Sequence, residues 1–127
     1  MRETVTAEGA PEALGPYSHA VKSNGLLFCS GQIPLDPSSG EIVGGPAADQ
    51  ARVCLQNLET VCAAAGAKLA DAVRVTVWLT DMGDFAAVNE VYEGFFPSDP
   101  PARVAIEVAG LPKNSLVEID AIVALPD

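Results

Sequence analysis

The sequence is poor in cationic and in metal-binding side chains. It has 7 Lys and Arg against 17 Asp and Glu, a formal net charge of −10, and a single histidine, His19, in 127 residues. A charge of this sign repels phosphate backbones and leaves no basic footprint for nucleic acid. One histidine and no Cys-x-x-Cys motif give no basis for a metal site. We therefore expect neither nucleic acid nor a metal ion as a partner.

Cysteine is also scarce, and its spacing argues against disulfides. The three cysteines are Cys29, Cys54 and Cys62, an odd count. Cys54 and Cys62 lie in one predicted helix at a separation of about 12 Å along its axis, which is too far for a disulfide. We expect small buried thiols in a reducing compartment.

Long apolar runs are absent as well. No window approaches the roughly 18 apolar residues that span a bilayer, and residues 1–8 lack the apolar core of a signal peptide. We therefore expect a cytoplasmic protein with no membrane association. With 49% hydrophobic residues, the chain fits one domain over residues 1–127 that buries about two-thirds of its unfolded surface.

The hydrophobic pattern alternates between strand and helix periods. Asn24-Gly25 predicts a tight hairpin turn, and Gly66 and Pro97 follow the two segments of helical period. We predict an edge strand within 1–13, a hairpin over 17–30, an irregular loop over 31–46, helices over 47–65 and 84–96, and strands over 71–80, 103–108 and 115–125. This order predicts an α+β fold in which two helices pack on one face of a mixed sheet.

The strand after Pro100-Pro101 places an arginine at its start. Its alternation indicates that Arg103 and Ala105 point away from the apolar layer. By itself this spacing fits either a surface ion pair or a ligand for carboxylate or phosphate. The sheet face without helices is predicted to carry Thr76, Trp78, Arg103, Ala105, Glu118 and Ile122. Because no third helix covers this mixed face, we expect copies of the chain to cover it.

Four motifs in order along the chain resemble the Rid family of imine deaminases, also called the YjgF type. They are Gly15-Pro16-Tyr17-Ser18, Ser30-Gly31-Gln32-Ile33-Pro34, Asp84-Phe85-Ala86-Ala87-Val88-Asn89 with Tyr92, Phe95 and Phe96, and Pro101-Ala102-Arg103 with Leu111-Pro112 and Glu118-Ile119. The resemblance implies a chorismate-mutase-like α+β fold and a homotrimer with active sites between subunits. It also implies hydrolysis of 2-imino acids, or of enamines such as 2-aminoacrylate, to 2-oxo acids and ammonia without a cofactor.

Two residues carry the chemistry that the resemblance implies. Arg103 matches the arginine that grips the substrate carboxylate, a task that suits a planar guanidinium able to donate two charge-assisted hydrogen bonds. Glu118 matches the glutamate that holds or activates the attacking water. Ala105 departs from the family, where well-known deaminases have a cysteine, so thiol regulation is in doubt more than catalysis.

The remaining matches belong to substrate binding. Tyr17 matches an aromatic that packs on the ligand, and Ser30 and Gly31 match a strand end that binds near the carboxylate or imine. Asn89 matches a further family position, and its place on the second helix also suits a structural role. His19, beside the first motif, is expected to face solvent.

Other functions remain open at this point. The same arginine cleft could bind a 2-oxo acid or similar anion as a non-catalytic regulatory module. A nuclease or translation inhibitor, activities attributed to some relatives, conflicts with the charge of −10. The sequence does not distinguish removal of many imines from one step of a catabolic pathway.

Overall fold

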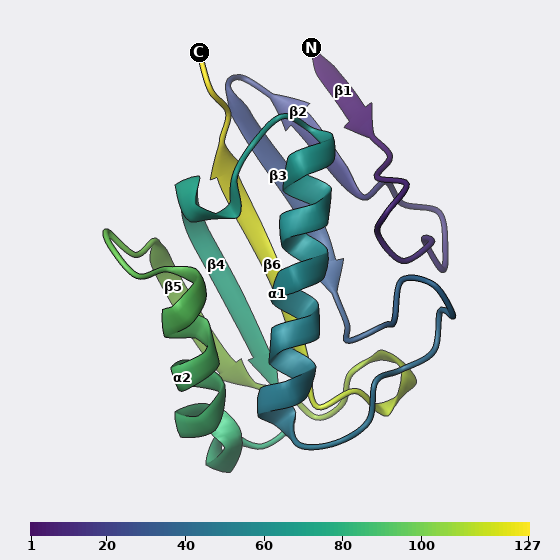
Figure 1. The fold of residues 1–127 in the computed structure, drawn as a ribbon, viewed down its shortest axis with the longest axis vertical. Helices are drawn as coiled ribbons and strands as arrows, with labels where there is room; N and C mark the ends of the chain where they lie inside the picture. Colours follow the sequence, from purple (N-terminus) through teal and green to yellow (C-terminus); the bar gives the residue numbers. More distant parts are fainter.

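The computed structural model describes all 127 residues and has two layers, a six-stranded sheet and a pair of helices (Figure 1). In chain order the elements are β1 (Arg2–Val5), β2 (Ala20–Ser23), β3 (Leu26–Gln32), α1 (Ala47–Ala64), β4 (Ala72–Leu79), α2 (Phe85–Phe95), β5 (Ala102–Glu107) and β6 (Val117–Ala124). This matches the predicted order of strands and helices and confirms the predicted fold class.

The sheet is mixed, with the order β1-β2-β3-β6-β4-β5. The only parallel pair is β4 with β5, and α2 is the crossover that joins them, as the strand–helix–strand pattern predicted. The chain's last strand, β6, lies between β3 and β4 and pairs with both in antiparallel register. The C-terminal strand therefore joins the β1–β3 part of the sheet to the β4–β5 pair.

The β2–β3 hairpin turns at Asn24 and Gly25. Their φ angles are 51° and 77°, both in the left-handed region. Two such residues in succession are typical of a type I′ turn, whose twist matches that of the flanking strands. The Asn-Gly signal in the sequence is therefore confirmed.

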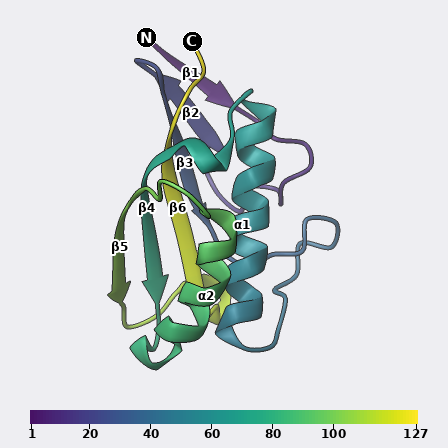
Figure 2. The ribbon, with the colours of Figure 1, turned by 60° about the vertical axis from the view of Figure 1, so that its left-hand side comes forward.

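Both helices cover the same face of the sheet (Figure 2). On α1 the apolar stripe includes Cys54, Leu58 and Val61, which are fully buried against strand residues such as Val75 and Ile119. These side chains belong to one contiguous cluster of 27 buried residues. Neither helix is both long and apolar enough to cross a membrane.

The other face of the sheet carries no helix, and several large apolar side chains are exposed there. Phe28, Val104 and Ile106 keep 42%, 37% and 43% of their surface exposed. Thr76, Trp78, Glu118 and Ile122 are half-buried on the same face, as predicted, because they alternate with the buried residues of β4 and β6. We call this surface the open face.

The prediction that Arg103 and Ala105 also lie on the open face is wrong. In the parallel β4–β5 register, Val75 pairs with Arg103 and Val77 with Ala105. Paired residues share a face, and Val75 and Val77 are buried under the helices. On this edge strand the apolar set faces outward, so its alternation identifies two faces but does not say which one is covered.

His19 is also not where the sequence placed it. Its ring is only 7% exposed, because Nδ1 accepts a hydrogen bond from the Ala7 N–H and Nε2 lies 2.9 Å from the Pro11 carbonyl oxygen. These two bonds require a neutral ring with its proton on Nε2. His19 thus ties the N-terminal segment to the start of β2. The cysteines, in contrast, are buried and free, as predicted.

Candidate functional site

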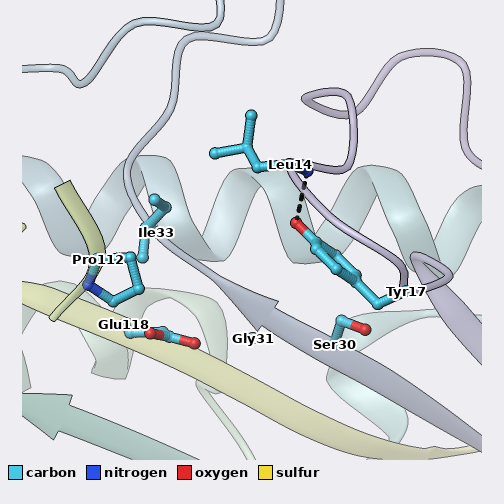
Figure 3. A pocket seen from close by; sticks show the side chains of 7 residues that line it. All are labelled: Leu14, Tyr17, Ser30, Gly31, Ile33, Pro112 and Glu118. Atoms are coloured by element: carbon cyan, nitrogen blue, oxygen red, sulfur yellow. Dashed lines mark hydrogen bonds between the residues drawn. The ribbon is translucent and has the colours of Figure 1, made fainter.

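A pocket on the open face collects four of the six residues that the sequence singled out (Figure 3). Its volume is about 330 Å³, and it opens to solvent. We call it the Glu118 pocket. It is lined by Leu14, Tyr17, Ser30, Gly31, Ile33, Pro112 and Glu118.

A bulge in β3 places Ser30 and Gly31 in this pocket. Cys29 pairs with Ala121 of β6, whereas Gln32 pairs with Ile119, so two residues of β3 oppose one residue of β6. Such a bulge bends the strand and redirects its side chains. Ser30 donates a hydrogen bond of 2.6 Å to the Ser18 carbonyl, which anchors the loop carrying Tyr17 to the strand.

Glu118 provides the ionisable group of the pocket. It comes from the central strand β6, directly opposite Trp78 of β4, and its side chain is half-buried. Burial raises the pKa of the Glu118 carboxyl above its ordinary value, and the nearby Asp120 carboxylate raises it further. A carboxylate with a raised pKa is a better proton acceptor than an ordinary surface glutamate.

Two loops form the rim of the pocket. The Tyr17 hydroxyl accepts a hydrogen bond of 3.3 Å from the Leu14 N–H, which closes a short turn over the pocket (Figure 3). The ring of Tyr17 stays 47% exposed and is free to pack on a ligand. The apolar walls of the pocket come from Leu14, Ile33 and Pro112. None of the three was assigned a role in the site from the sequence, although each belongs to one of the four motifs or lies next to it.

Arg103 and Asn89 lie elsewhere, on the helix-covered face. The Arg103 guanidinium donates a hydrogen bond of 2.6 Å to Oδ1 of Asn89. Its Cζ atom lies 4.7 Å from the ring centroid of Tyr92 and 5.2 Å from that of Phe85, within the range of cation–π contacts. We call these four residues the Arg103 cluster. Phe85 and Tyr92 belong to the third family motif, but nothing in the sequence had indicated that they contact the arginine.

The Arg103 cluster holds its cation in an exposed, oriented state. The Asn89 amide and the two rings that contact the guanidinium are all neutral, so these contacts leave its charge available to an anion. A hollow beside it is lined by Asn89, Tyr92, Glu93, Phe96, Pro100, Pro101 and Arg103. Ala105, two residues further along β5, is partly buried against the core. Within one chain, the acid and the cation of the predicted site therefore lie on opposite sides of the sheet.

Comparison with known proteins places this fold and these motifs in one group. The sequence model of the family described as Endoribonuclease L-PSP matches residues 7–125. A RutC family protein of Pyrococcus horikoshii is 52% identical over 122 residues, which cover 96% of this chain and 97% of that protein. The 2-iminobutanoate/2-iminopropanoate deaminase of Homo sapiens is 44% identical over 122 residues, covering 96% of this chain and 89% of the human protein.

Solved structures agree with the sequence comparison. The Rid family protein YyfA from Yersinia pestis superposes with a TM-score of 0.95 at 36% identity, covering 98% of this chain and 100% of that one. TdcF of E. coli with bound serine superposes with a TM-score of 0.91 at 39% identity, covering 98% of this chain and 99% of TdcF. Identities of this size over nearly the whole chain establish common family membership.

Proposed function

This chain belongs to the Rid family, also called the YjgF type, and on that premise we propose that it hydrolyses reactive 2-imino acids and their enamine tautomers to 2-oxo acids and ammonia. Suitable substrates are 2-aminoacrylate and 2-iminobutyrate. The relatives named 2-iminobutanoate/2-iminopropanoate deaminase support this reaction class. The observation that carries the proposal is the half-buried Glu118 carboxylate with a raised pKa, placed in a small open pocket.

The reaction needs little beyond placement and proton transfer. Glu118 takes a proton from a water molecule as the water oxygen bonds to the carbon of the protonated imine, which gives a neutral carbinolamine. Glu118 returns this proton to the nitrogen, the C–N bond breaks with release of ammonia, and Glu118 accepts the hydroxyl proton as the carbonyl forms. One water is consumed for each ammonia released, so the step balances without an external redox partner.

The substrate carboxylate is assigned to Arg103. Each charge-assisted hydrogen bond from a guanidinium to a carboxylate contributes about 1.5–3 kcal/mol. Asn89 holds Nη1, which leaves the other donors of the guanidinium for the anion. In this proposal Asn89 orients the arginine at the edge of the substrate site rather than acting on the imine.

The two halves of the site would be combined by a second copy of the chain. Arg103 and Glu118 lie on opposite faces of one sheet, and the open face exposes Phe28, Val104 and Ile106. A neighbour that covers these side chains removes apolar surface from water. We propose a homotrimer in which the Arg103 cluster of one subunit closes the Glu118 pocket of the next.

The side chain of the substrate would rest on the apolar walls of the Glu118 pocket. Leu14, Ile33 and Pro112 supply these walls, and the pocket contains no cationic residue. A second carboxylate on the substrate would face Glu118 and be repelled. Short aliphatic 2-imino acids therefore fit this pocket better than 2-imino dicarboxylic acids.

Imine trapping tests the proposal. An amino-acid oxidase generates 2-imino acids in place, semicarbazide traps them, and the protein should deplete the trappable imine. Arg103→Ala and Glu118→Gln should each abolish the depletion, whereas Arg52→Ala and Glu59→Gln, on the exposed side of α1, should not. Retained hydrolysis in Glu118→Gln would reject the role of that residue. Binding of a 2-oxo acid at Arg103 without turnover would instead indicate a regulatory module.

A further inference from the structure

Gly31 is in close contact with the carboxylate that the proposed reaction uses. A Cβ atom added at Gly31 would overlap with Oε2 at the end of the Glu118 side chain, and it would lie 3.0 Å from Cδ and 3.3 Å from Cγ, so the carboxylate would have to move. The side chain of Glu118 therefore lies flat across the backbone of the β3 bulge. Any side chain at position 31 would occupy the space of the carboxylate.

The need for glycine at this position is steric rather than conformational. Gly25, Gly40, Gly45 and Gly66 have positive φ angles, and Gly31 is not among them. The φ of Gly31 therefore lies outside the left-handed region that favours glycine. What position 31 requires is the absence of a Cβ, and the group that fills the vacant space belongs to Glu118.

The bulge in β3 brings Gly31 into contact with Glu118. Because Ser30 and Gly31 together oppose one residue of β6, the strand shifts its register between Cys29 and Gln32. This shift brings the glycine alongside Glu118 on the open face. A regular strand would place a side chain from β3 beside Glu118 and leave less room for its carboxylate.

We propose that Gly31 is a positioning residue that holds the Glu118 carboxylate flat against β3, within the pocket and oriented toward the imine carbon. This inference rests on the proposed function and adds to it a role for the bulge itself. The contact also keeps one side of the carboxylate away from water, in agreement with the raised pKa of Glu118. Gly31 acts through Glu118 and not through the substrate.

The test is Gly31→Ala, with Gly44→Ala as the matched control. At Gly44 an added Cβ meets nothing within 4 Å, and its φ is not among the positive angles. A displacement of the base by about 1 Å costs on the order of 10²-fold in rate. We expect Gly31→Ala to lower kcat by about that factor with KM little changed, and Gly44→Ala to leave both unchanged. An unchanged kcat in Gly31→Ala would overturn the inference.

Glu118→Asp distinguishes positioning from a general structural defect. In the parent protein it should reduce kcat, because the shorter side chain withdraws the carboxylate from the water. In the Gly31→Ala background it should cause no further loss, since the shorter side chain relieves the overlap with the new methyl group. Independent losses that multiply would contradict an action through Glu118.

A second measurement reads the position of the carboxylate without any substrate. The Glu118 side chain, labelled with ¹³C at Cδ and assigned by its disappearance in Glu118→Gln, is titrated in the parent and in Gly31→Ala. We expect the pKa of Glu118 to fall toward its ordinary value in Gly31→Ala, because the displaced carboxylate enters solvent. An identical titration in both proteins would overturn the inference. A parent protein that fails to hydrolyse imines but shows this shift would reject only the proposed function.

Discussion

The Glu118 pocket and the Arg103 cluster differ in how each holds its charged group. Glu118 lies on a central strand, flat against a glycine and half-buried, so its neighbours shift its pKa. Arg103 lies on an edge strand, where one amide and two aromatic rings fix its orientation while leaving it exposed. The pocket changes the proton affinity of its acid, and the cluster only directs its cation.

This difference suits the two tasks of the proposed reaction. A base that exchanges protons gains from a desolvated setting, whereas a guanidinium is always charged and gains from a fixed direction. The chain keeps the two groups on opposite faces of its sheet.

The largest expected effect comes from combining the two regions in different subunits. Arg103→Ala and Glu118→Gln should each be inactive, yet a mixed assembly made by co-expression should recover activity. With random mixing of equal amounts, about a quarter of the interfaces would pair an intact Arg103 with an intact Glu118. Differently tagged subunits allow the mixed assembly to be purified before imine trapping. A mixed assembly with no activity would place both residues' roles within single chains.

The second largest expected effect is on the pH dependence of kcat, which should depend on the Glu118 pocket and not on the Arg103 cluster. Glu118 acts as a base only when deprotonated, so kcat should be full above its folded-state pKa and should fall about tenfold per pH unit below it. Because that pKa is raised, the fall should begin at a higher pH than for an ordinary glutamate. Substrate binding through Arg103 should not follow this transition. A profile that is flat across the acid range would contradict the role of Glu118.

The free energy of unfolding should depend on the Glu118 carboxyl in the opposite sense to kcat, which rises with pH. The folded state binds the Glu118 proton more tightly than the unfolded chain, so stability falls as pH rises from the unfolded pKa through the folded one. The effect is small because the carboxyl is only half-buried and solvent screens it. Glu118→Gln should therefore lose activity without losing stability at neutral pH.

The sequence predicted the elements well because their signals are local. The helical periods, Asn24-Gly25 and the alternation in β4 each depend on neighbouring residues, and the structure confirms them. The sequence could not predict on which face of the sheet Arg103 lies, because that depends on the register between β4 and β5. An edge strand with an outward apolar set has the same alternation as one with an inward set.

The candidate site shows the same limit. The motifs named Tyr17, Ser30, Gly31 and Glu118, and the structure places all four in one pocket. The contact between Gly31 and Glu118 was not predictable, because it depends on a bulge in the pairing of β3 with β6. His19 was expected in solvent since its two backbone partners, Ala7 and Pro11, lie in a loop without sequence periodicity.

The smallest expected effect concerns Tyr92 in the Arg103 cluster, whose ring and hydroxyl contribute differently to stability. The ring supports the guanidinium, but the hydroxyl is buried without a hydrogen-bond partner, and burial raises its pKa above the ordinary value. An unsatisfied buried hydroxyl costs about 1–3 kcal/mol. Tyr92→Phe should therefore raise the free energy of unfolding by about 1 kcal/mol, measured by denaturant at fixed protein concentration.

The activity of the same variant sharpens the contrast between the two regions. Because Tyr92→Phe keeps an aromatic face under Arg103, kcat and KM should stay near parental values. Tyr92→Leu removes that face, and the loss of about 0.5–1 kcal/mol of cation–π attraction should raise KM by about 2–5-fold with kcat unchanged. A Tyr92→Phe protein less stable than the parent would instead mean that the hydroxyl has a partner, such as an ordered water, and that it belongs to the polar framework of the Arg103 cluster.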